Sequence, residues 1–448
     1  MTNEAKLPPG DIPDLGPPPA TGTTHAWSER YGNAENDNVA GVATDPNGNV
    51  YIVGKLSGTV DMGTQLTSSG QTDLYVASFK PDGTPRWARR FGEAATSETA
   101  LAVVADSAGQ VYVTGQAFGG IVFGSSAEPG QGQTDVFLLA LKQSTGDHVW
   151  SRLLGSPGFD SGHALAVDPG NNLYVTGAIA GDTDFGGGVV ANATQNDVFV
   201  ASYSSSGSYR WANRYGGAGT DTGEGIAAGG GAVYVTGSFD GVIDFGQGPR
   251  PTVQNLDVFL VSLTTAKGEH RWDRTFGSTF YDMGLAAAVD DLGHVYVTGS
   301  VQGPVDLGGG APVVFNKGTD GFVASYDAQG VHRWSVGFGG PGSDGGGTLA
   351  IDAAGNLTLG GYHSGGLSLG ALNSQGGNDV LLASFTGGGA LRWILGAGSP
   401  NTDSCKGVAV DPASNLYVTG TFGQTIAIGG PDLPAAGGVD IFLAKLVP

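Results

Sequence analysis

The chain has 448 residues, with 41 Asp and Glu against 20 Lys and Arg, which gives a net charge of −21. This acidic balance argues against nucleic acid as a partner, because phosphates require a basic surface, and against adhesion to anionic lipid. No run approaches the roughly 20 apolar residues of a transmembrane helix, so we expect no membrane insertion. The one cysteine, Cys405, excludes an internal disulfide.

Residues 1–24 contain six prolines and predict a Pro-rich spacer that is disordered or extended. The first residues after Met1, TNEAKLPPG, lack the basic and apolar segments of a signal peptide. Two interpretations follow. Either the protein is cytosolic, or its targeting segment precedes this sequence.

A long phrase then returns seven times, and its clearest copy runs from Asp197 to Gly216, DVFVASYSSSGSYRWANRYG. Each copy holds one tryptophan, and these are all the tryptophans in the chain: Trp27, Trp87, Trp150, Trp211, Trp272, Trp334 and Trp393. A glycine follows each by five residues, and an aspartate opens each apolar run: Asp73, Asp135, Asp197, Asp257, Asp320, Asp379 and Asp440. Such self-similarity predicts a repeat architecture, in which each unit buries its apolar face only by stacking on neighbours.

Each unit predicts four strands. In residues 217–277 these are a short strand within GTDTGEGIAAGG, then AVYVTGSF, the alternating run DVFLVSL and the closing GEHRWDRTFG. The stretch GVIDFG either continues the second strand or forms a small extra one. Four-stranded sheets repeated radially make a β-propeller. The sequence therefore predicts one all-β domain, a seven-bladed β-propeller of antiparallel blades, over residues 25–448. The expected blades cover about 33–92, 93–155, 156–216, 217–277, 278–339, 340–398, and 399–448 plus 25–32.

The two ends of the repeat region complement each other. Residues 440–446 form a third strand without a fourth, and residues 25–32 form a fourth strand without a third. We therefore expect the N-terminal outer strand to pair with the C-terminal strands and to close the ring.

The phrases DxFVASY, GxxxW, AxDxxGNxYVTG and DFG resemble the bacterial SBBP β-propeller repeat, common in large secreted and lipid-anchored proteins of myxobacteria. The similarity covers about residues 25–448, with Gly229 and Thr358 as small departures. Residues 141–146, before Trp150, also look like the tryptophan-docking motif of quinoprotein propellers. The SBBP family shares a fold and no common activity. The resemblance therefore implies an interaction module in an extracellular or cell-surface location, with a lipid anchor as an option in a longer form.

A set of aspartates stands ten residues after the tryptophans, in the loop from the outer strand of one blade to the inner strand of the next: Asp37, Asp160, Asp221, Asp282, Asp344 and Asp403. Ser97 takes the remaining position, with Glu98 beside it. In a propeller these loops open at the mouth of the central channel. One interpretation is a shared cation such as Ca²⁺, which prefers oxygen ligands. The other is that each carboxylate accepts backbone N–H groups within its own loop.

Catalysis requires residues that differ between repeats, because one site needs several chemical roles. Few residues break the pattern: His163, Phe280, Tyr281, Cys405 and Lys406. His163 follows Asp160 on the inner strand and is a candidate for the channel mouth. Phe280 and Tyr281 offer an apolar platform for a sugar or peptide. Cys405 has no histidine or basic partner at a readable spacing, so we do not expect a nucleophile.

These patterns predict a non-enzymatic binding or scaffold module, surface-displayed or secreted, that recognises a protein or glycan partner on the channel-mouth face. The ligand-binding candidates are Asp160, His163, Asp221, Phe280 and Tyr281, and no residue is assigned to catalysis. One alternative is a hydrolase or lyase at the channel mouth, built on Asp160, His163 and Asp221. Another is a structural spacer without a ligand. We expect a monomer without a cofactor, with calcium as the alternative.

Overall fold

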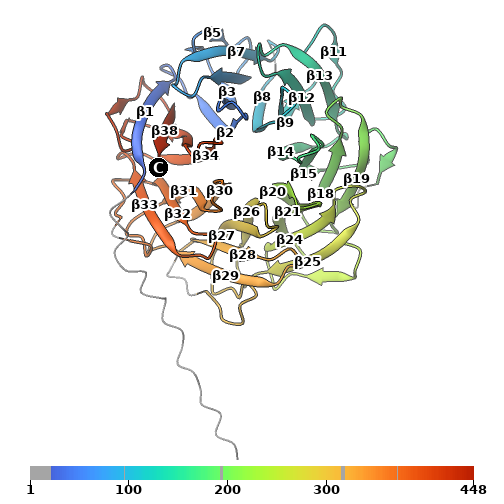
Figure 1. Cartoon of the computed structure of the whole chain (residues 1–448). Helices are drawn as coiled ribbons and strands as arrows, with labels where there is room; N and C mark the ends of the chain where they lie inside the picture. The colour runs from blue at the N-terminus through green and yellow to red at the C-terminus, as the bar shows by residue number, and fades with distance from the viewer. Residues whose placement is uncertain (1–21, 95, 192–194, 314–317, 371) are drawn as a thin grey trace, which may run out of the picture.

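A computed structural model describes residues 22–94, 96–191, 195–313, 318–370 and 372–448. Seven antiparallel four-stranded sheets stand around a central axis, like blades around a hub (Figure 1). The prediction of an all-β, seven-bladed β-propeller is confirmed. The predicted spacer, residues 1–24, falls almost entirely outside the described residues.

Each blade runs from an inner strand beside the axis to an outer strand on the rim. In that order the strands of the seven blades are, for blade 1, β2 (Asn38–Thr44), β3 (Val50–Leu56), β6 (Asp73–Phe79) and β7 (Pro85–Phe91); for blade 2, β8 (Glu98–Ala105), β9 (Gln110–Phe118), β12 (Thr134–Lys142) and β13 (His148–Leu154); for blade 3, β14 (Ser161–Val167), β15 (Leu173–Ile179), β18 (Asp197–Tyr203) and β19 (Tyr209–Tyr215); for blade 4, β20 (Thr222–Gly229), β21 (Ala232–Phe239), β24 (Asp257–Thr264) and β25 (His270–Phe276); for blade 5, β26 (Met283–Val289), β27 (Val295–Val301), β28 (Asp320–Tyr326) and β29 (His332–Phe338); for blade 6, β30 (Gly345–Ile351), β31 (Leu357–His363), β32 (Asp379–Phe385) and β33 (Leu391–Ala397); and for blade 7, β34 (Ser404–Val410), β35 (Leu416–Phe422), β38 (Asp440–Val447) and β1 (Thr24–Tyr31).

Blade 7 joins the two ends of the propeller. Strand β1 pairs antiparallel with β38, from Thr24 opposite Val447 to Tyr31 opposite Ile441. The first strand of the chain is therefore the outer strand of the last blade, beside the red C-terminal strands in Figure 1. This pairing confirms the predicted closure.

Because neighbouring strands of a blade run antiparallel, successive connections lie on opposite faces of the propeller. The channel-mouth face carries the blade-to-blade loops and the connections between second and third strands. The opposite face carries the turns between first and second strands and between third and fourth strands. On the channel-mouth face several blades add a small hairpin: β4 (Thr59–Asp61) with β5 (Gln65–Thr67), β10 (Ile121–Val122) with β11 (Ala127–Glu128), β16 (Thr183–Asp184) with β17 (Val189–Val190), β22 (Val242–Asp244) with β23 (Pro249–Pro251), and β36 (Thr425–Ile426) with β37 (Leu433–Pro434). The stretch GVIDFG is thus a small extra strand, β22.

The middle strands of each blade hold the core, because both of their faces pack against neighbouring blades. Every residue of β15 and of β18 is buried, for example. Continuous apolar runs such as DVFVASY are therefore strands covered on two sides, where β-branched and aromatic side chains pack well. Among the described residues, no helix is long and apolar enough to cross a membrane.

In six of the seven blades the repeated tryptophan donates a hydrogen bond to the next blade. Trp211 Nε1, on the outer strand of blade 3, donates a hydrogen bond of 3.1 Å to the carbonyl of Thr265 in blade 4. Its ring packs below Gly268 of the same turn, where an added Cβ would lie 2.6 Å from the indole. Five other tryptophans donate equivalent bonds: Trp27, Trp87, Trp150, Trp272 and Trp334. Trp393 faces blade 7, whose third and fourth strands are the two chain ends and share no turn.

Candidate functional site in the central channel and at its mouth

The six predicted aspartates of the blade-to-blade loops, here called the loop aspartates, are all fully buried: Asp37, Asp160, Asp221, Asp282, Asp344 and Asp403. Each lies immediately before an inner strand, below the surface of the channel-mouth face. The glycine-rich loops turn their N–H groups inward, and the short aspartate side chain reaches these groups. The structure thus places the carboxylates within the blades and not in the channel.

Asp221 shows the contacts that the set shares. Its Oδ2 accepts the N–H of Gly217 at 3.0 Å, and its Oδ1 accepts the N–H of Asp240 at 3.0 Å. Its own N–H donates to the carbonyl of Asn196 in the preceding blade at 2.8 Å. One residue therefore joins its own loop, the following loop of its blade and the neighbouring blade. Burial raises the pKa of Asp221 to about 6, although its two backbone hydrogen bonds act in the opposite direction.

These contacts agree with the interpretation of the loop aspartates as acceptors of backbone N–H groups. Among the described residues, no group of three or more His, Cys, Asp or Glu side chains lies close enough together to hold a metal ion. Calcium binding by the loop aspartates stays a prediction for experiment.

Glu98 occupies the corresponding place in blade 2. It is fully buried, and neither carboxylate oxygen accepts a hydrogen bond from a described residue. A Cβ added to Gly92 would meet Glu98 Oε2 at 2.6 Å and Asp73 Oδ1 at 2.5 Å, so the two carboxylates face the same glycine. Burial, with the nearby charge of Asp73, raises the pKa of Glu98 to about 7.

The aspartates that open the third strands have a structural role as well. Asp197 is fully buried and pairs with Arg214 on the outer strand of its blade at 2.9 Å. It also explains the glycine five residues after each tryptophan, because a Cβ on Gly216 would lie 2.0 Å from Asp197 Oδ1. Asp73 pairs with Arg90, and Asp440 pairs with Arg30, in the same way.

A β-bulge interrupts every inner strand three residues after the loop aspartate or Glu98. The pairing of β14 with β15, for example, skips one residue between Gly162 and Ala164. The glycine of the YVTG phrase makes room for this bulge, since a Cβ on Gly177 would lie 2.0 Å from the carbonyl oxygen of Ser161. The bulge residues, in blade order, are Ala40, Leu101, His163, Glu224, Leu285, Gly347 and Lys406.

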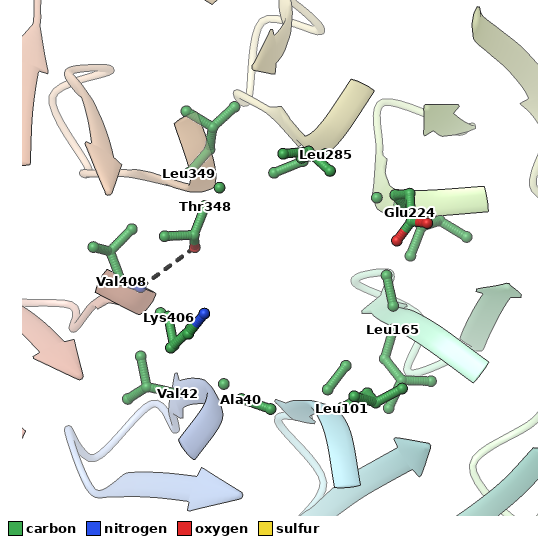
Figure 2. Close-up of a pocket in the computed structure, with 18 of the residues that line it drawn as sticks. Ala40, Val42, Leu101, Leu165, Glu224, Leu285, Thr348, Leu349, Lys406 and Val408 are labelled. Carbon is green, nitrogen blue, oxygen red and sulfur yellow. Dashed lines mark hydrogen bonds between the residues drawn. The ribbon is translucent and has the colours of Figure 1, made fainter. Parts of the chain in front are cut away.

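This bulge ring surrounds the axis and differs from blade to blade, unlike the loop aspartates. Six of its members line a cavity of about 230 Å³ in the channel: Ala40, Leu101, Glu224, Leu285, Gly347 and Lys406. Figure 2 shows Lys406 and Glu224 on opposite walls of this cavity, with leucine side chains between them. The channel thus contains both signs of charge, and aliphatic side chains lie on the same wall.

His163 lies on the inner strand, as predicted, but its partner is in the next blade. His163 Nδ1 is 3.1 Å from Glu224 Oε2, and about a quarter of each side chain is exposed. Burial lowers the pKa of His163, but the contact with Glu224 outweighs this effect, so the pKa lies above its ordinary value. The hydrogen bonds of Asp160 and Asp221 go to their own loops and not to His163.

Cys405, next to Lys406, points away from the solvent. Only 5% of its surface is exposed, and burial raises the pKa of its thiol to about 12. It packs in the apolar core between blades 6 and 7. The expectation that Cys405 is not a nucleophile agrees with this environment.

The predicted aromatic pair lies on the channel-mouth face. Phe280 is 53% exposed and Tyr281 is 54% exposed, in the loop between blades 4 and 5. Ser278 holds this loop, because its Oγ accepts the N–H of Phe280 and its N–H donates to Asp282. The candidates of the sequence thus divide among three places: buried loops, the channel, and an exposed aromatic loop.

Sequence reasoning missed Glu224, although a usable signal was present. The position three residues after each loop aspartate varies in charge and size between repeats, whereas the positions around it stay small or apolar. The bulge that turns this residue toward the axis is not visible in the alternation of the strand.

The ring of blades, closed by its own terminal strand and perforated by a narrow channel, defines a seven-bladed β-propeller. More particularly, three stretches of the chain are similar to one repeat family, because the family model described as SBBP beta-propeller repeat matches residues 26–55, 149–186 and 393–421. The resemblance inferred from the repeated phrases is confirmed at these three places.

Other comparisons cover parts of proteins or the fold alone. The chain is 31% identical over 209 residues to the regulatory protein FlaEY of Caulobacter vibrioides, a match that covers 44% of this chain. The chain spans about a fifth of that relative, since the match covers 22% of its length. Solved structures with a similar fold include quinohemoprotein alcohol dehydrogenase from Comamonas testosteroni (12% identity, TM-score 0.43, 94% of this chain and 76% of that one). They also include BamB from Moraxella catarrhalis (11% identity, TM-score 0.42, 94% of this chain and 99% of that one).

Proposed function

We propose that this propeller is a non-enzymatic binding module that recognises a protein partner on its channel-mouth face. The observation that carries the proposal is a set of four exposed apolar side chains from two connections on this face, here called the loop cluster: Val242, Val253, Phe280 and Tyr281, which are 46%, 57%, 53% and 54% exposed. Aromatic anchors on rigid surfaces are typical centres of protein interfaces. The proposal extends the sequence prediction of a binding or scaffold role, and favours protein over glycan.

The loop cluster is held in place by hydrogen bonds. Val242 and Val253 belong to the region of the β22–β23 hairpin, where Val242 pairs with Pro251. Asn255 Nδ2 donates to the carbonyl of Thr279 at 2.9 Å, which joins this hairpin region to the aromatic loop. A surface ordered before binding loses less conformational entropy when a partner docks.

The charge around the loop cluster favours a basic partner. Asp240 and Asp244 are exposed on either side of Val242, and the whole chain carries a net charge of −21. Opposite charges at an interface steer association and select partners. We therefore infer that the partner presents an apolar side chain flanked by Lys or Arg. The relative FlaEY is named a regulatory protein, and a role in binding is compatible with that name. Secretion or surface display remains part of the proposal.

A peptide array tests this function. It should contain peptides with an aromatic or aliphatic centre flanked by Lys and Arg, and the same peptides with Asp and Glu in the flanks. We expect the protein to bind the basic set, with affinity that falls as salt rises. The double variant F280S/Y281S should lose roughly tenfold or more in affinity.

Leu292→Ser is the matched control, because Leu292 is 79% exposed but lies on the opposite face, in the turn between β26 and β27. Equal binding of the acidic and basic sets, or an unchanged affinity in F280S/Y281S, would contradict the proposal. Binding to neither set would support the structural spacer instead.

A further inference from the structure

The channel wall of blade 7 carries a cation, Lys406. Lys406 follows Cys405 at the bulge of blade 7, and its side chain is exposed to the lumen. Among the described residues, it forms no ion pair with a carboxylate. Figure 2 shows its nitrogen directed into the cavity. None of the other six residues of the bulge ring is a lysine or an arginine. Lys406 therefore distinguishes the wall that blade 7 contributes from the others.

The opposite wall holds an anion that is only partly engaged. Glu224 Oε2 contacts His163 Nδ1 at 3.1 Å, and among the described residues no hydrogen bond is directed to Glu224 Oε1. About a quarter of the side chain is exposed. His163 fixes the position of this carboxylate and leaves one oxygen available to the lumen.

The space between the two charges is small, and aliphatic side chains form part of its wall. The cavity measures about 230 Å³, below the roughly 300–1,000 Å³ of pockets for drug-sized ligands. Leu101, Leu165, Leu285 and Leu349 contribute apolar surface to its wall (Figure 2). Glu224 would repel a simple anion, and Lys406 would repel a simple cation. A small molecule with both charges and an apolar side chain satisfies all three parts of the wall.

We propose that the channel is a binding site for a free aliphatic α-amino acid, with its carboxylate on Lys406 and its ammonium group on Glu224. Leucine is the probe that fits this chemistry. The site lies in the channel and is independent of the loop cluster, so either proposal can fail without the other.

Isothermal titration calorimetry with L-leucine at concentrations up to about 10 mM tests the site. Two analogues isolate the charges: 4-methylpentanoate lacks the ammonium group, and 3-methylbutylamine lacks the carboxylate. We expect the intact protein to prefer leucine over both by roughly tenfold or more, since a hydrogen bond to a charged group is worth that much. Lys406→Met should remove the preference for leucine over 3-methylbutylamine. Glu224→Gln should remove the preference for leucine over 4-methylpentanoate.

Two further variants keep the test decisive. Gly347→Leu fills the lumen without touching either charge. A Cβ at Gly347 meets only one atom within 4 Å, the carbonyl oxygen of Gly360 at 3.9 Å, so the ring can accept it. This variant should abolish leucine binding and leave the thermal melt unchanged. Lys267→Met, a 75% exposed lysine in an outer turn, should bind as the intact protein does. No heat of leucine binding, or undiminished binding in Lys406→Met and Gly347→Leu, would overturn the proposal.

Discussion

Arg30 and Asp440 form an ion pair that joins residues 410 positions apart, with 3.1 Å between Arg30 Nη1 and Asp440 Oδ2. Asp440 is fully buried, while about a third of the Arg30 side chain is exposed. The equivalent pair, Arg214 with Asp197, lies within blade 3, where a turn joins the two strands. In blade 7 the strands are joined by hydrogen bonds and side-chain contacts alone.

Arg30→Met should lower the free energy of unfolding by about 2–3 kcal/mol, because it leaves a buried carboxylate without its cation. It should also make strand β1 sensitive to protease. Arg214→Met is the matched control. It should cost a similar free energy, yet its outer strand stays tethered by the β18–β19 turn. Equal protease sensitivity of the two variants would show that the ion pair does not control closure. Urea denaturation and limited proteolysis measure the two effects.

The tryptophans should contribute unequally to stability. Trp211→Phe removes a hydrogen bond to the next blade, whereas no described residue accepts a hydrogen bond from Trp393 Nε1. We expect Trp211→Phe to cost roughly 1 kcal/mol more than Trp393→Phe in chemical denaturation. A greater loss in Trp393→Phe would mean that the seam at blade 7 depends on its tryptophan more than the continuous blades do.

Glu98 should make stability depend on pH. Its pKa is raised from 4.5 to about 7 in the folded protein, so the folded state binds a proton more tightly than the unfolded state. Its contribution is therefore fully present below about pH 4.5 and is lost as the pH rises through 7. Glu98→Gln should raise the free energy of unfolding by roughly 1–2 kcal/mol at pH 8 and little at pH 4.5. Glu93→Gln, at an exposed neighbour, is the control. A gain that is equal at both pH values would contradict a titrating carboxylate.

Asp221→Asn should destabilise the ring at neutral pH. An amide group can replace only one of the two acceptors, so its NH₂ group would face the N–H of Gly217 or of Asp240. We expect a loss of about 1–3 kcal/mol. Asp291→Asn, at an exposed position on the opposite face, should have no effect. Thermal melts of both variants measure this difference, and a neutral result for Asp221→Asn would indicate that its loop contacts are dispensable.

Calcium should leave the melting temperature unchanged relative to EDTA. Each loop aspartate already accepts backbone N–H groups within its own loops, as Asp344 does from Gly340 and Ser364. A specific ion at a thousandfold excess over its Kd would add about 4 kcal/mol. A clear upward shift in calcium would restore the cation interpretation of these six residues.

The sequence was enough to predict the architecture, because the repeat of Trp211 and its counterparts gives the number of blades. The complementary ends similarly predict the pairing of β1 with β38. The arrangement of the candidate site was harder to predict. A glycine-rich loop does not tell whether Asp160 points inward to backbone N–H groups or outward to solvent. Nor does strand alternation show the bulge that brings Glu224 to the axis, since a bulge depends on pairing with a second strand.

Because β1 closes the ring by pairing with β38, closure must wait until the end of the chain has been synthesised. Strand β1 is made first among the strands of the propeller, and its partner β38 is made last. At about 5–20 residues per second, translation separates them by roughly 20–80 seconds. Throughout this interval β1 is an unpaired edge, which other chains could join. The charges of Glu29 and Arg30 on this strand make such joining less favourable, so the residues that seal the ring also protect the growing chain from aggregation.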